Sequence, residues 1–323
     1  MEEREAGRLR RAPSIVGLGT WQLGADWGEV ADAGAVLDAA IDRGVTFLDT
    51  ADVYGDGRSE RACGALRERH PGVRIATKMG RRVPQLAENY HAAAFREWNA
   101  RSRENLGVQT LDLVALHCPP DGVYADDAVF EALDAMVDEG LVHAYGVSVE
   151  TCEQALAAIA RPRVASVQII LNCLRLKPLE EVLPAARAAG VAIIARVPLA
   201  SGLLSGRYDE HTVFPSDDHR AYNRLGEAFD IGETFSGVPY DVGLAAAREL
   251  AALVDPGVTL AQFALRWVID QPGVTTVIPG ARSPQQVAAN AAAAATAPLR
   301  EEQLAGVRDV YDRLIRAHVH SRW

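Results

Sequence analysis

A short stretch near residue 50 joins an apolar run to side chains that can exchange protons. Val45–Leu48 is apolar and partly β-branched, as expected of a strand buried in a parallel sheet. Asp49, Asp52 and Tyr54 follow it directly, before the turn residue Gly55. In α/β folds, chemistry is carried by side chains that follow the carboxyl end of a buried strand. Asp49 and Tyr54 are therefore candidate catalytic residues, a carboxylate beside a phenol.

Two further candidates, Lys78 and His117, each directly follow a later apolar run. A free tyrosine has a pKa near 10, about three units too high to exchange protons easily near neutrality, which corresponds to roughly 4 kcal/mol. One lysine ammonium at about 4 Å, in an effective dielectric of about 20, supplies a similar energy. We therefore expect Lys78 to lower the pKa of Tyr54 while Asp49 holds the ammonium. His117 would orient the oxygen of a carbonyl group.

Other chemistries fit these residues less well. A glycosidase needs two carboxylates across the site, and the strands that end in His117 and Arg196 add no second acid. A metal hydrolase needs several converging ligands, whereas only Asp49 and His117 qualify, with a cationic lysine beside them. A Schiff-base aldolase could use Lys78, but a lysine paired with Asp49 is protonated and a poor nucleophile. We predict no metal, and a phenol that donates a proton to a carbonyl.

Reduction of a carbonyl also needs a hydride source. A stretch near the C-terminus can bind the phosphates of a dinucleotide that supplies the hydride. Ile278–Gln286 has the pattern of a strand end, a glycine turn and a helix start, where free N–H groups and the helix dipole favour an anion. Arg282 can form a forked pair with a phosphate. Gln286 and Asn290, one turn apart, can reach an adenine edge.

The Gly17-x-Gly19 pair near the N-terminus is the other glycine pattern that a dinucleotide could use. In a Rossmann fingerprint the third glycine would stand at position 22, which holds Gln22. Bulky Trp21 also occupies the place that a pyrophosphate approaches. We therefore reject a Rossmann-type site.

Strand and helix signals alternate along the whole chain, without a linker, and make eight units at fairly even spacing. The first predicted helix is Val30–Asp42, and Ser59 is expected to cap the next one. Thr151-x-x-Gln154 and Thr259-x-x-Gln262 are capping boxes. One domain over residues 1–323 uses all eight units: an α/β fold, the (β/α)₈ TIM barrel of roughly 250 residues, with extra helices after strand seven and at the C-terminus. The predicted strands are Ile15–Gly19, Val45–Leu48, Val73–Thr77, Leu111–Leu116, Val142–Val147, Ala165–Ile170, Ala192–Val197 and Thr275–Ile278.

The composition, with 49% hydrophobic and 24% charged residues, is that of an ordinary globular protein. A formal net charge of −10 and the lack of a basic run argue against a nucleic acid or a membrane surface as partner. Met1–Arg10 is charged throughout, so we expect no signal peptide. The sequence contains no run of about 18 apolar residues, so we expect no membrane span. The four cysteines lack the spacing of a zinc or redox motif. We expect reduced thiols and a cytoplasmic location, and leave the oligomeric state open.

Several motifs extend these observations along nearly the whole chain, from about Val16 to Asn290. They are Leu48-Asp49-Thr50-Ala51-Asp52-Val53-Tyr54-Gly55, Thr77-Lys78, Leu116-His117, Gly146-Val147-Ser148, Val167-Gln168, Pro198-Leu199-Ala200-Ser201-Gly202-Leu203-Leu204-Ser205-Gly206 and Ile278-Pro279-Gly280-Ala281-Arg282. Together they resemble the aldo-keto reductase family. The resemblance implies an NADPH-dependent barrel whose catalytic tetrad consists of Asp49, Tyr54, Lys78 and His117.

The resemblance also implies which residues bind NADPH or NADP⁺. Ser148 and Gln168 would contact the nicotinamide carboxamide, and Val149 stands where many members carry an asparagine. Leu199–Leu203 would lie along the pyrophosphate, and Arg282 near the adenosine 2′-phosphate. The implied cofactor-binding residues are Gly19, Thr20, Trp21, Ser148, Gln168, Pro198, Leu199, Ala200, Ser201, Gly202, Leu203, Ile278, Gly280, Arg282, Gln286 and Asn290.

The predicted function is the NADPH-dependent reduction of an aldehyde or ketone to an alcohol, with Tyr54 as general acid and a small molecule as substrate. Two alternatives stay open: an NADPH-binding regulatory subunit of the channel-associated kind, and a barrel that catalyses dehydration or isomerisation without net hydride transfer. Two readings stay open for the charge-rich loop 206–239: a lid or substrate wall, and a solvated excursion. The aromatic residues that can line an apolar pocket are Trp21, Trp27, Tyr124 and Tyr222.

Overall fold

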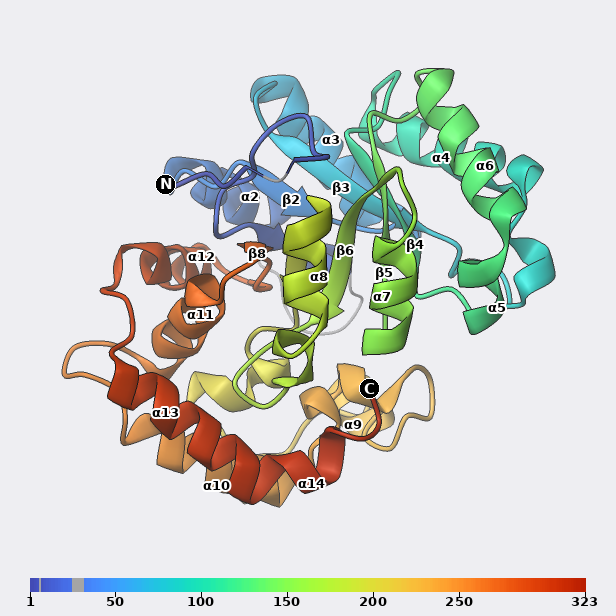
Figure 1. Cartoon of the computed structure of the whole chain (residues 1–323). Helices are drawn as coiled ribbons and strands as arrows, with labels where there is room; N and C mark the ends of the chain where they lie inside the picture. The colour runs from blue at the N-terminus through green and yellow to red at the C-terminus, as the bar shows by residue number, and fades with distance from the viewer. Residues whose placement is uncertain (6, 25–31) are drawn as a thin grey trace.

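The computed structural model describes residues 1–5, 7–24 and 32–323, and its eight strands form one parallel sheet in sequential order (Figure 1). The bridges Val16–Val277 and Gly19–Gly280 join β1 to the last strand, so the sheet is a nearly closed barrel. The predicted (β/α)₈ TIM barrel is confirmed. The strands are β1 (Leu18–Gly19), β2 (Phe47–Asp49), β3 (Arg74–Met79), β4 (Leu113–His117), β5 (Tyr145–Ser148), β6 (Val164–Ile170), β7 (Ala192–Arg196) and β8 (Val274–Val277).

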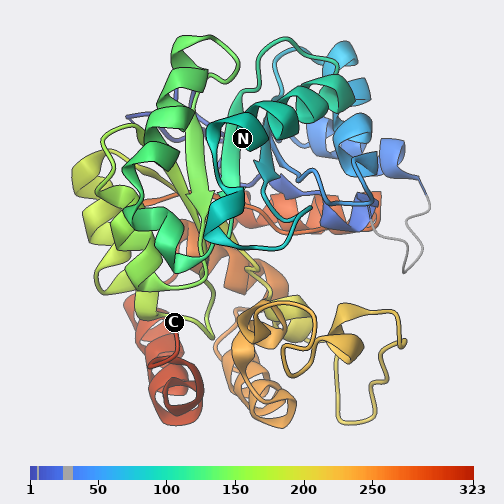
Figure 2. The same cartoon turned by 90° about the vertical axis from the view of Figure 1, so that its right-hand side faces the viewer.

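Helices connect successive strands and pack around the outside of the barrel (Figure 2). The boxes at Thr151 and Thr259 form with both of their hydrogen bonds, as predicted. The connecting helices are α2 (Ala33–Asp42), α3 (Arg58–Arg69), α4 (Ala92–Leu106), α6 (Asp127–Asp138), α7 (Cys152–Ile159), α8 (Val182–Ala189) and α11 (Leu260–Asp270), and α12 (Pro284–Ala292) follows the last strand. The predicted start of the first helix at Val30 lies outside the described residues, and the described part begins after the N-cap Asp32.

The prediction that Ser59 caps α3 is wrong. The N-cap is Gly57, two residues earlier, so the helix begins at Arg58; Gly57 adopts a φ of 83° that a glycine accepts without strain. The Ser59 hydroxyl is instead buried, where it donates to the Thr20 carbonyl at 3.0 Å and accepts from the Thr50 hydroxyl at 2.8 Å. Ser59 therefore ties the segment after β1 to the segment after β2.

The extra helices lie where the sequence predicted them, after β7 and at the C-terminus. α10 (Tyr240–Ala251) lies alongside α13 (Glu301–Val310), and α14 (Arg316–Val319) continues α13 through a π-helical turn at Tyr311–Ile315 (Figure 1). The short helix α5 (Asp121–Ala125) was not predicted. Loop 206–239 contains α9 (His219–Tyr222) and the 3₁₀ turns η4 (Ile231–Glu233) and η5 (Phe235–Gly237). Within the described ranges, no helix is long and apolar enough to span a membrane.

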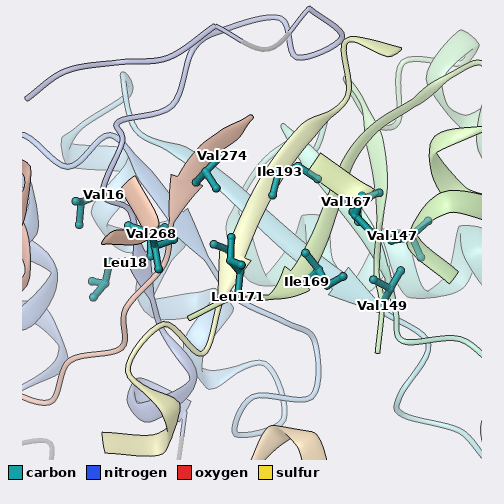
Figure 3. Packing of buried hydrophobic residues seen from close by; sticks show 14 of the residues in the cluster. Val16, Leu18, Val147, Val149, Val167, Ile169, Leu171, Ile193, Val268 and Val274 are labelled. Atoms are coloured by element: carbon teal, nitrogen blue, oxygen red, sulfur yellow. The ribbon is translucent and has the colours of Figure 1, made fainter. Parts of the chain in front are cut away.

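Apolar side chains fill both sides of the strands. Figure 3 shows Val147, Val167 and Ile193 on the neighbouring strands β5, β6 and β7, in the large cluster between sheet and helices. A second cluster takes residues from successive strands and fills the barrel interior, with Leu9 packed against it. Its members are Phe47, Ala76, Leu113, Ala144, Ala165, Ile194 and Ile278.

The two ends of the barrel have different roles. At the end where strands begin, Arg4 donates to the carbonyl of Val274 at 3.1 Å and Arg8 to that of Val164 at 2.9 Å, so the N-terminal segment covers this end. Side chains two positions beyond an interior residue point to the same face of their strand. Asp49 and Lys78 stand two positions beyond Phe47 and Ala76, and they therefore face the barrel axis at the opposite end.

Candidate active site

Asp49 and Lys78 form a buried ion pair on adjacent strands. Lys78 Nζ donates to Asp49 Oδ1 at 2.5 Å and to the Thr50 carbonyl at 2.8 Å. The two side chains are 5% and 2% exposed. Burial alone would lower the pKa of Lys78, but the neighbouring Asp49 and Tyr54 raise it above its ordinary value. Lys78 is therefore a charged ammonium, as the sequence predicted, and not an amine nucleophile.

Tyr54 lies in the loop after β2, with its phenol directed at Lys78. Lys78 Nζ donates to Tyr54 Oη at 3.4 Å and lies 5.0 Å from the ring centroid. Burial raises the pKa of Tyr54; Lys78 lowers it, and Asp49 and Glu233 raise it further. The expectation that Lys78 brings this pKa down towards neutrality is wrong for this structure, because burial outweighs the ammonium. Tyr54 keeps its proton at neutral pH, which is the state a proton donor needs.

His117 ends β4 and faces Tyr54. The two ring centroids are 6.0 Å apart and the rings meet edge to face, at 82°. Burial lowers the pKa of His117 well below its usual value, and the cations Arg81, Lys78 and Arg196 lower it further. Its Nδ1 has no hydrogen-bond partner within the described part of the chain. A neutral imidazole beside the phenol can hydrogen-bond a carbonyl oxygen without competing for its proton.

Gln168 and Ser148, which the resemblance assigned to the nicotinamide, have partners within the protein. Gln168 Nε2 donates to Asp49 Oδ2 at 2.7 Å, so Gln168 also holds the carboxylate that holds Lys78. The Ser148 hydroxyl accepts from the Cys118 thiol at 3.5 Å. The Thr20 hydroxyl and N–H both donate to the Asp49 carbonyl, each at 2.9 Å. These contacts show a bracing role for Gln168 and Thr20 that the strand-end pattern could not reveal.

The segment after β7 has an unusual backbone. Val197, Ala200 and Ser201 have φ of 52°, 47° and 53°, where side chains other than glycine are strained. Gly202 follows at 97°, and a Cβ there would lie 2.6 Å from the Tyr208 hydroxyl. Several non-glycine residues in this conformation within a few positions are typical of a functional loop. The strain falls within and next to Pro198–Leu203, the segment expected to follow the pyrophosphate.

The turn after β8 is braced by its own amides. Gln286 Oε1 accepts from the Arg282 N–H at 2.7 Å, and Asn290 Nδ2 donates to the Gly280 carbonyl at 3.2 Å. Ser283 caps α12 by accepting from the Gln286 N–H at 3.3 Å. Ile278 belongs to the interior cluster. Gln286 and Asn290, expected to reach an adenine, thus fix the shape of the turn in this structure.

The neighbours of that turn include two residues that the sequence did not single out. Arg282 Nη2 lies 3.8 Å from Asp218 Oδ2, which belongs to loop 206–239. Arg220 Nε donates to the same carboxylate at 2.8 Å. Burial alone would raise the pKa of Asp218, but its hydrogen bonds from Arg220 and His219 lower it below its ordinary value. Asp218 is therefore an anion held between two arginines.

Loop 206–239 also brings aromatic side chains to the barrel mouth. Trp21, in α1 (Trp21–Gly24), lies 4.7 Å from the His219 ring and 6.5 Å from those of Phe229 and Tyr54. Tyr222 stacks edge-on against Phe229 at 6.2 Å. Tyr124 lies in α5, within the large core cluster. Of the predicted pocket residues, Trp21 and Tyr222 both contact Phe229, and Trp27 lies outside the described residues.

Four charged residues form what we call the mouth network: Arg81, Glu150, Arg196 and Glu233. Arg81 Nη2 donates to Glu150 Oε1 and to Glu233 Oε1, both at 3.0 Å. Arg196 Nη2 donates to Glu150 Oε2 at 2.7 Å, and Arg196 Nη1 lies 3.8 Å from Glu233 Oε2. Ligand atoms of Cys118, Glu150 and Glu233 also lie within 4.8 Å of one another. The two guanidinium groups neutralise these carboxylates, so the cluster is an ion-pair network.

The fold is that of an aldo-keto reductase. The model of the Aldo/keto reductase family matches residues 15–312, and the chain belongs to this family of oxidoreductases. The resemblance noted in the sequence is confirmed.

Individual relatives agree over nearly full length. Aldo-keto reductase YhdN of Bacillus subtilis is 31% identical over 284 residues, which cover 85% of this chain and 83% of the relative. An aldo/keto reductase from Klebsiella pneumoniae, solved in complex with NADP and acetate, has a TM-score of 0.69 and 27% identity, with 96% of each chain covered. A probable voltage-gated potassium channel subunit beta of Oryza sativa is 29% identical over 319 residues, which cover 93% of each chain.

Proposed function

We propose that this protein is an NADPH-dependent reductase that converts an aldehyde or ketone into an alcohol. The observation that carries the proposal is the Tyr54 phenol, 3.4 Å from an ammonium that is itself paired with Asp49 at 2.5 Å. His117 faces the same phenol as a neutral imidazole. Such a group binds a carbonyl oxygen and gives it a proton.

The residues around the barrel mouth fit a dinucleotide. At two glycines the chain's own side chains approach the backbone closely: a Cβ at Gly202 would collide with Tyr208, and one at Gly280 with the Gln22 side chain at 2.4 Å. The N-terminus of α12, with Arg282 beside it, suits a phosphate. When bound, NADPH supplies a hydride to the carbonyl carbon. NADP in the Klebsiella pneumoniae complex supports this choice of cofactor.

The cofactor would extend along the predicted residues from the barrel mouth to α12. Pro198–Leu203 would follow the pyrophosphate, beside Gly19, Thr20 and Trp21. Ser148 and Gln168 would meet the nicotinamide carboxamide. Arg282, with Gln286 and Asn290 behind it, would face the 2′-phosphate.

In the reaction, each member of the tetrad has one task. His117 orients the carbonyl oxygen towards Tyr54 Oη. Tyr54 gives its proton to that oxygen as the carbonyl carbon gains the hydride, and a phenolate remains. The Lys78 ammonium stabilises this phenolate, and Asp49 keeps the ammonium in place.

A second candidate, an NADPH-binding regulatory subunit, is favoured by the rice potassium channel relative. An intact tetrad favours the reductase, because a subunit that only binds cofactor does not need a buried proton donor. The buried free thiols of Cys63, Cys118, Cys152 and Cys173 are consistent with a cytoplasmic protein that acts on a small molecule.

Tyr54→Phe tests the proposal. We expect carbonyl reduction to fall by roughly 10²-fold or more, since the transferable proton is lost while the ring is kept. The measurement is multiple-turnover oxidation of NADPH with a panel of aldehydes and ketones. Quenching of tryptophan fluorescence by NADPH should persist in the variant. Near-wild-type turnover would remove Tyr54 as the acid, and no turnover in wild type would favour the regulatory subunit or a reaction without hydride transfer.

A further inference from the structure

Glu233 is the one member of the mouth network that does not come from the barrel. Arg81 lies two residues after β3, Glu150 two residues after β5, and Arg196 ends β7. Glu233 lies in η4 of loop 206–239, and its carbonyl accepts from the Ser201 hydroxyl at 3.1 Å. With Glu233 in place, two cations face two anions. Without it, the network would carry one uncompensated positive charge.

The network borders the catalytic tetrad. Arg81 lies three residues beyond Lys78 on the same chain segment, and Glu150 lies two residues beyond Ser148, which pairs with His117 in the sheet. Its charges reach the tetrad: Glu233 contributes to the raised pKa of Tyr54 after burial and Asp49, while Arg81 and Arg196 contribute to the lowered pKa of His117 after burial. The charge state of the network therefore bears on the proton donor.

We propose that Glu233 is a positioning residue for carbonyl reduction: seated on Arg81 and Arg196, its carboxylate cancels a positive charge that would otherwise draw the proton from Tyr54. The inference rests on the function proposed above. Reduction needs Tyr54 as the phenol, whose proton goes to the carbonyl oxygen. Alcohol oxidation needs the phenolate, which takes the alcohol proton. Glu233 thus keeps Tyr54 protonated, and reduction active, up to a higher pH. The effect requires loop 206–239 to hold Glu233 against Arg81 and Arg196.

The pKa values of Glu233 and Glu150 are shifted in opposite directions. Burial opposes the ionisation of Glu150, yet Arg196 and Arg81 bring its pKa below the usual value. Burial, with Glu150 adjacent, raises the pKa of Glu233. Arg81 and Arg196 contact the Glu233 carboxyl, at 3.0 Å and 3.8 Å, and both oppose the rise of its pKa. Rising pH also favours the charged form of Glu233, so its charge acts on Tyr54 in the alkaline range where a tyrosine ionises. The charged and titratable groups facing the two residues come from several elements. They are Asp49, Lys78, His117 and Glu233 for Tyr54, and Arg81, Cys118, Glu150, Arg196, His219 and Tyr222 for Glu233.

The test is the ionisation of Tyr54 in the free protein. The ultraviolet absorbance of tyrosinate is recorded just after a rapid jump to alkaline pH, and the signal of Tyr54 is the difference between each variant and the same variant carrying Tyr54→Phe. Glu233→Gln should increase the ionised fraction of Tyr54 about 3- to 10-fold at any pH below its midpoint, a shift of about 0.5–1 pH unit. The alkaline limb of NADPH-dependent reduction should move down by the same amount.

Two variants separate charge from structure. Glu233→Asp keeps the charge and should leave Tyr54 close to wild type. Glu210→Gln removes a carboxylate from the same loop, in an exposed pair with Arg248, and should change nothing. An unchanged ionised fraction in Glu233→Gln, or an equal increase in Glu233→Asp or Glu210→Gln, would overturn the inference. The absorbance does not depend on turnover, so a wild type without reductase activity would refute the proposed function and leave this result readable.

Discussion

The two ends of the proposed cofactor site hold their charges in different ways. At the catalytic end, Lys78 and Asp49 lie on adjacent strands, 2.5 Å apart and at most 5% exposed. At the phosphate end, Arg282 lies 3.8 Å from Asp218, and 28% of its side chain is exposed. The first pair is fixed by the sheet. The second joins the turn after β8 to loop 206–239. In the proposed function, the 2′-phosphate of NADPH would take the place of the Asp218 carboxylate beside Arg282.

Asp52 adds a contrast within the catalytic end itself. It is 1% exposed, and neither of its carboxylate oxygens has a hydrogen-bond partner in the described ranges. Burial, with Glu60 nearby, raises the pKa of Asp52 to about 7, although Arg82 and Arg101 oppose the shift. Asp49 and Asp52 are three residues apart. A paired carboxylate and an unpaired carboxyl group therefore stand side by side in one segment.

Lys78→Met, at the catalytic end, should have the largest effect of these variants on stability and activity. Removing the ammonium leaves the Asp49 carboxylate buried without a counter-ion, and breaking a buried pair from one side costs about 3–5 kcal/mol of the free energy of unfolding. Carbonyl reduction should be lost as well. The measurement is urea-induced unfolding, followed by far-ultraviolet circular dichroism.

Lys177→Met is the matched control, because Lys78 and Lys177 are the only lysines of the chain. Lys177 pairs with Glu153 at 3.3 Å, and the two side chains are 22% and 73% exposed. Loss of such a pair should cost less than about 1 kcal/mol. An equal loss in the free energy of unfolding for the two variants would show that the buried Lys78–Asp49 pair stabilises the fold no more than an exposed pair does.

The catalytic end could be predicted from the sequence because each part of it depends on a local pattern. An apolar run followed by Asp49 or Lys78 marks a strand end, and the strand ends of a barrel meet on one side. The ionisation of Tyr54 could not be predicted, because an estimate from one lysine omits burial. The partner of Gln168 could not be predicted either, since register and side-chain direction decide which neighbour an amide meets.

The phosphate end was predicted less completely. Arg282 stands beside a glycine turn and a helix start, and the sequence shows both. Loop 206–239 has no hydrophobic periodicity, so nothing distinguishes the buried Asp218 from the exposed Asp217 beside it. Tertiary packing alone selects Asp218 and Glu233 as the acids that turn inward. For the same reason the mouth network was missed, although Arg196 was recognised as a strand end.

Asp52→Asn should sharpen the contrast between the paired and the unpaired carboxyl. The pKa of Asp52 rises from 3.8 to about 7 on folding, so the folded protein binds the proton more tightly. The resulting stability is present in full below about pH 4, falls as the pH rises towards 7, and is lost above that. Asparagine cannot ionise, so the variant should exceed wild type by about 2–4 kcal/mol near pH 8 and match it near pH 4.

Urea-induced unfolding across this pH range is the measurement, with Asp217→Asn as the control. Asp217 is an exposed carboxylate on loop 206–239, and its replacement should leave the pH dependence unchanged. An Asp52→Asn variant that follows the wild-type pH dependence would mean that Asp52 ionises in the folded protein as it does in the unfolded one.

Arg282→Ala tests the phosphate end, where the effect should be smallest in free energy and most selective. A charge-assisted contact with the 2′-phosphate contributes about 1.5–3 kcal/mol, so NADPH binding should weaken by roughly 10- to 150-fold at fixed salt. NADH lacks the phosphate, and its affinity should barely change. The preference for NADPH in wild type should shrink as salt rises, because the guanidinium is partly exposed. Fluorescence titrations of both cofactors measure these affinities.

Two further variants decide what Arg282 contributes. Arg282→Lys keeps a positive charge but loses the fork, so its NADPH affinity should lie between those of wild type and Arg282→Ala. Arg248→Ala removes an exposed arginine that pairs with Glu210, and it should affect neither cofactor. Equal losses for NADPH and NADH in Arg282→Ala would mean that the side chain holds the turn, through Asp218 and loop 206–239, and does not read the phosphate. The phosphate end would then be a second fixed pair like Lys78 and Asp49, and the difference between the two ends would disappear.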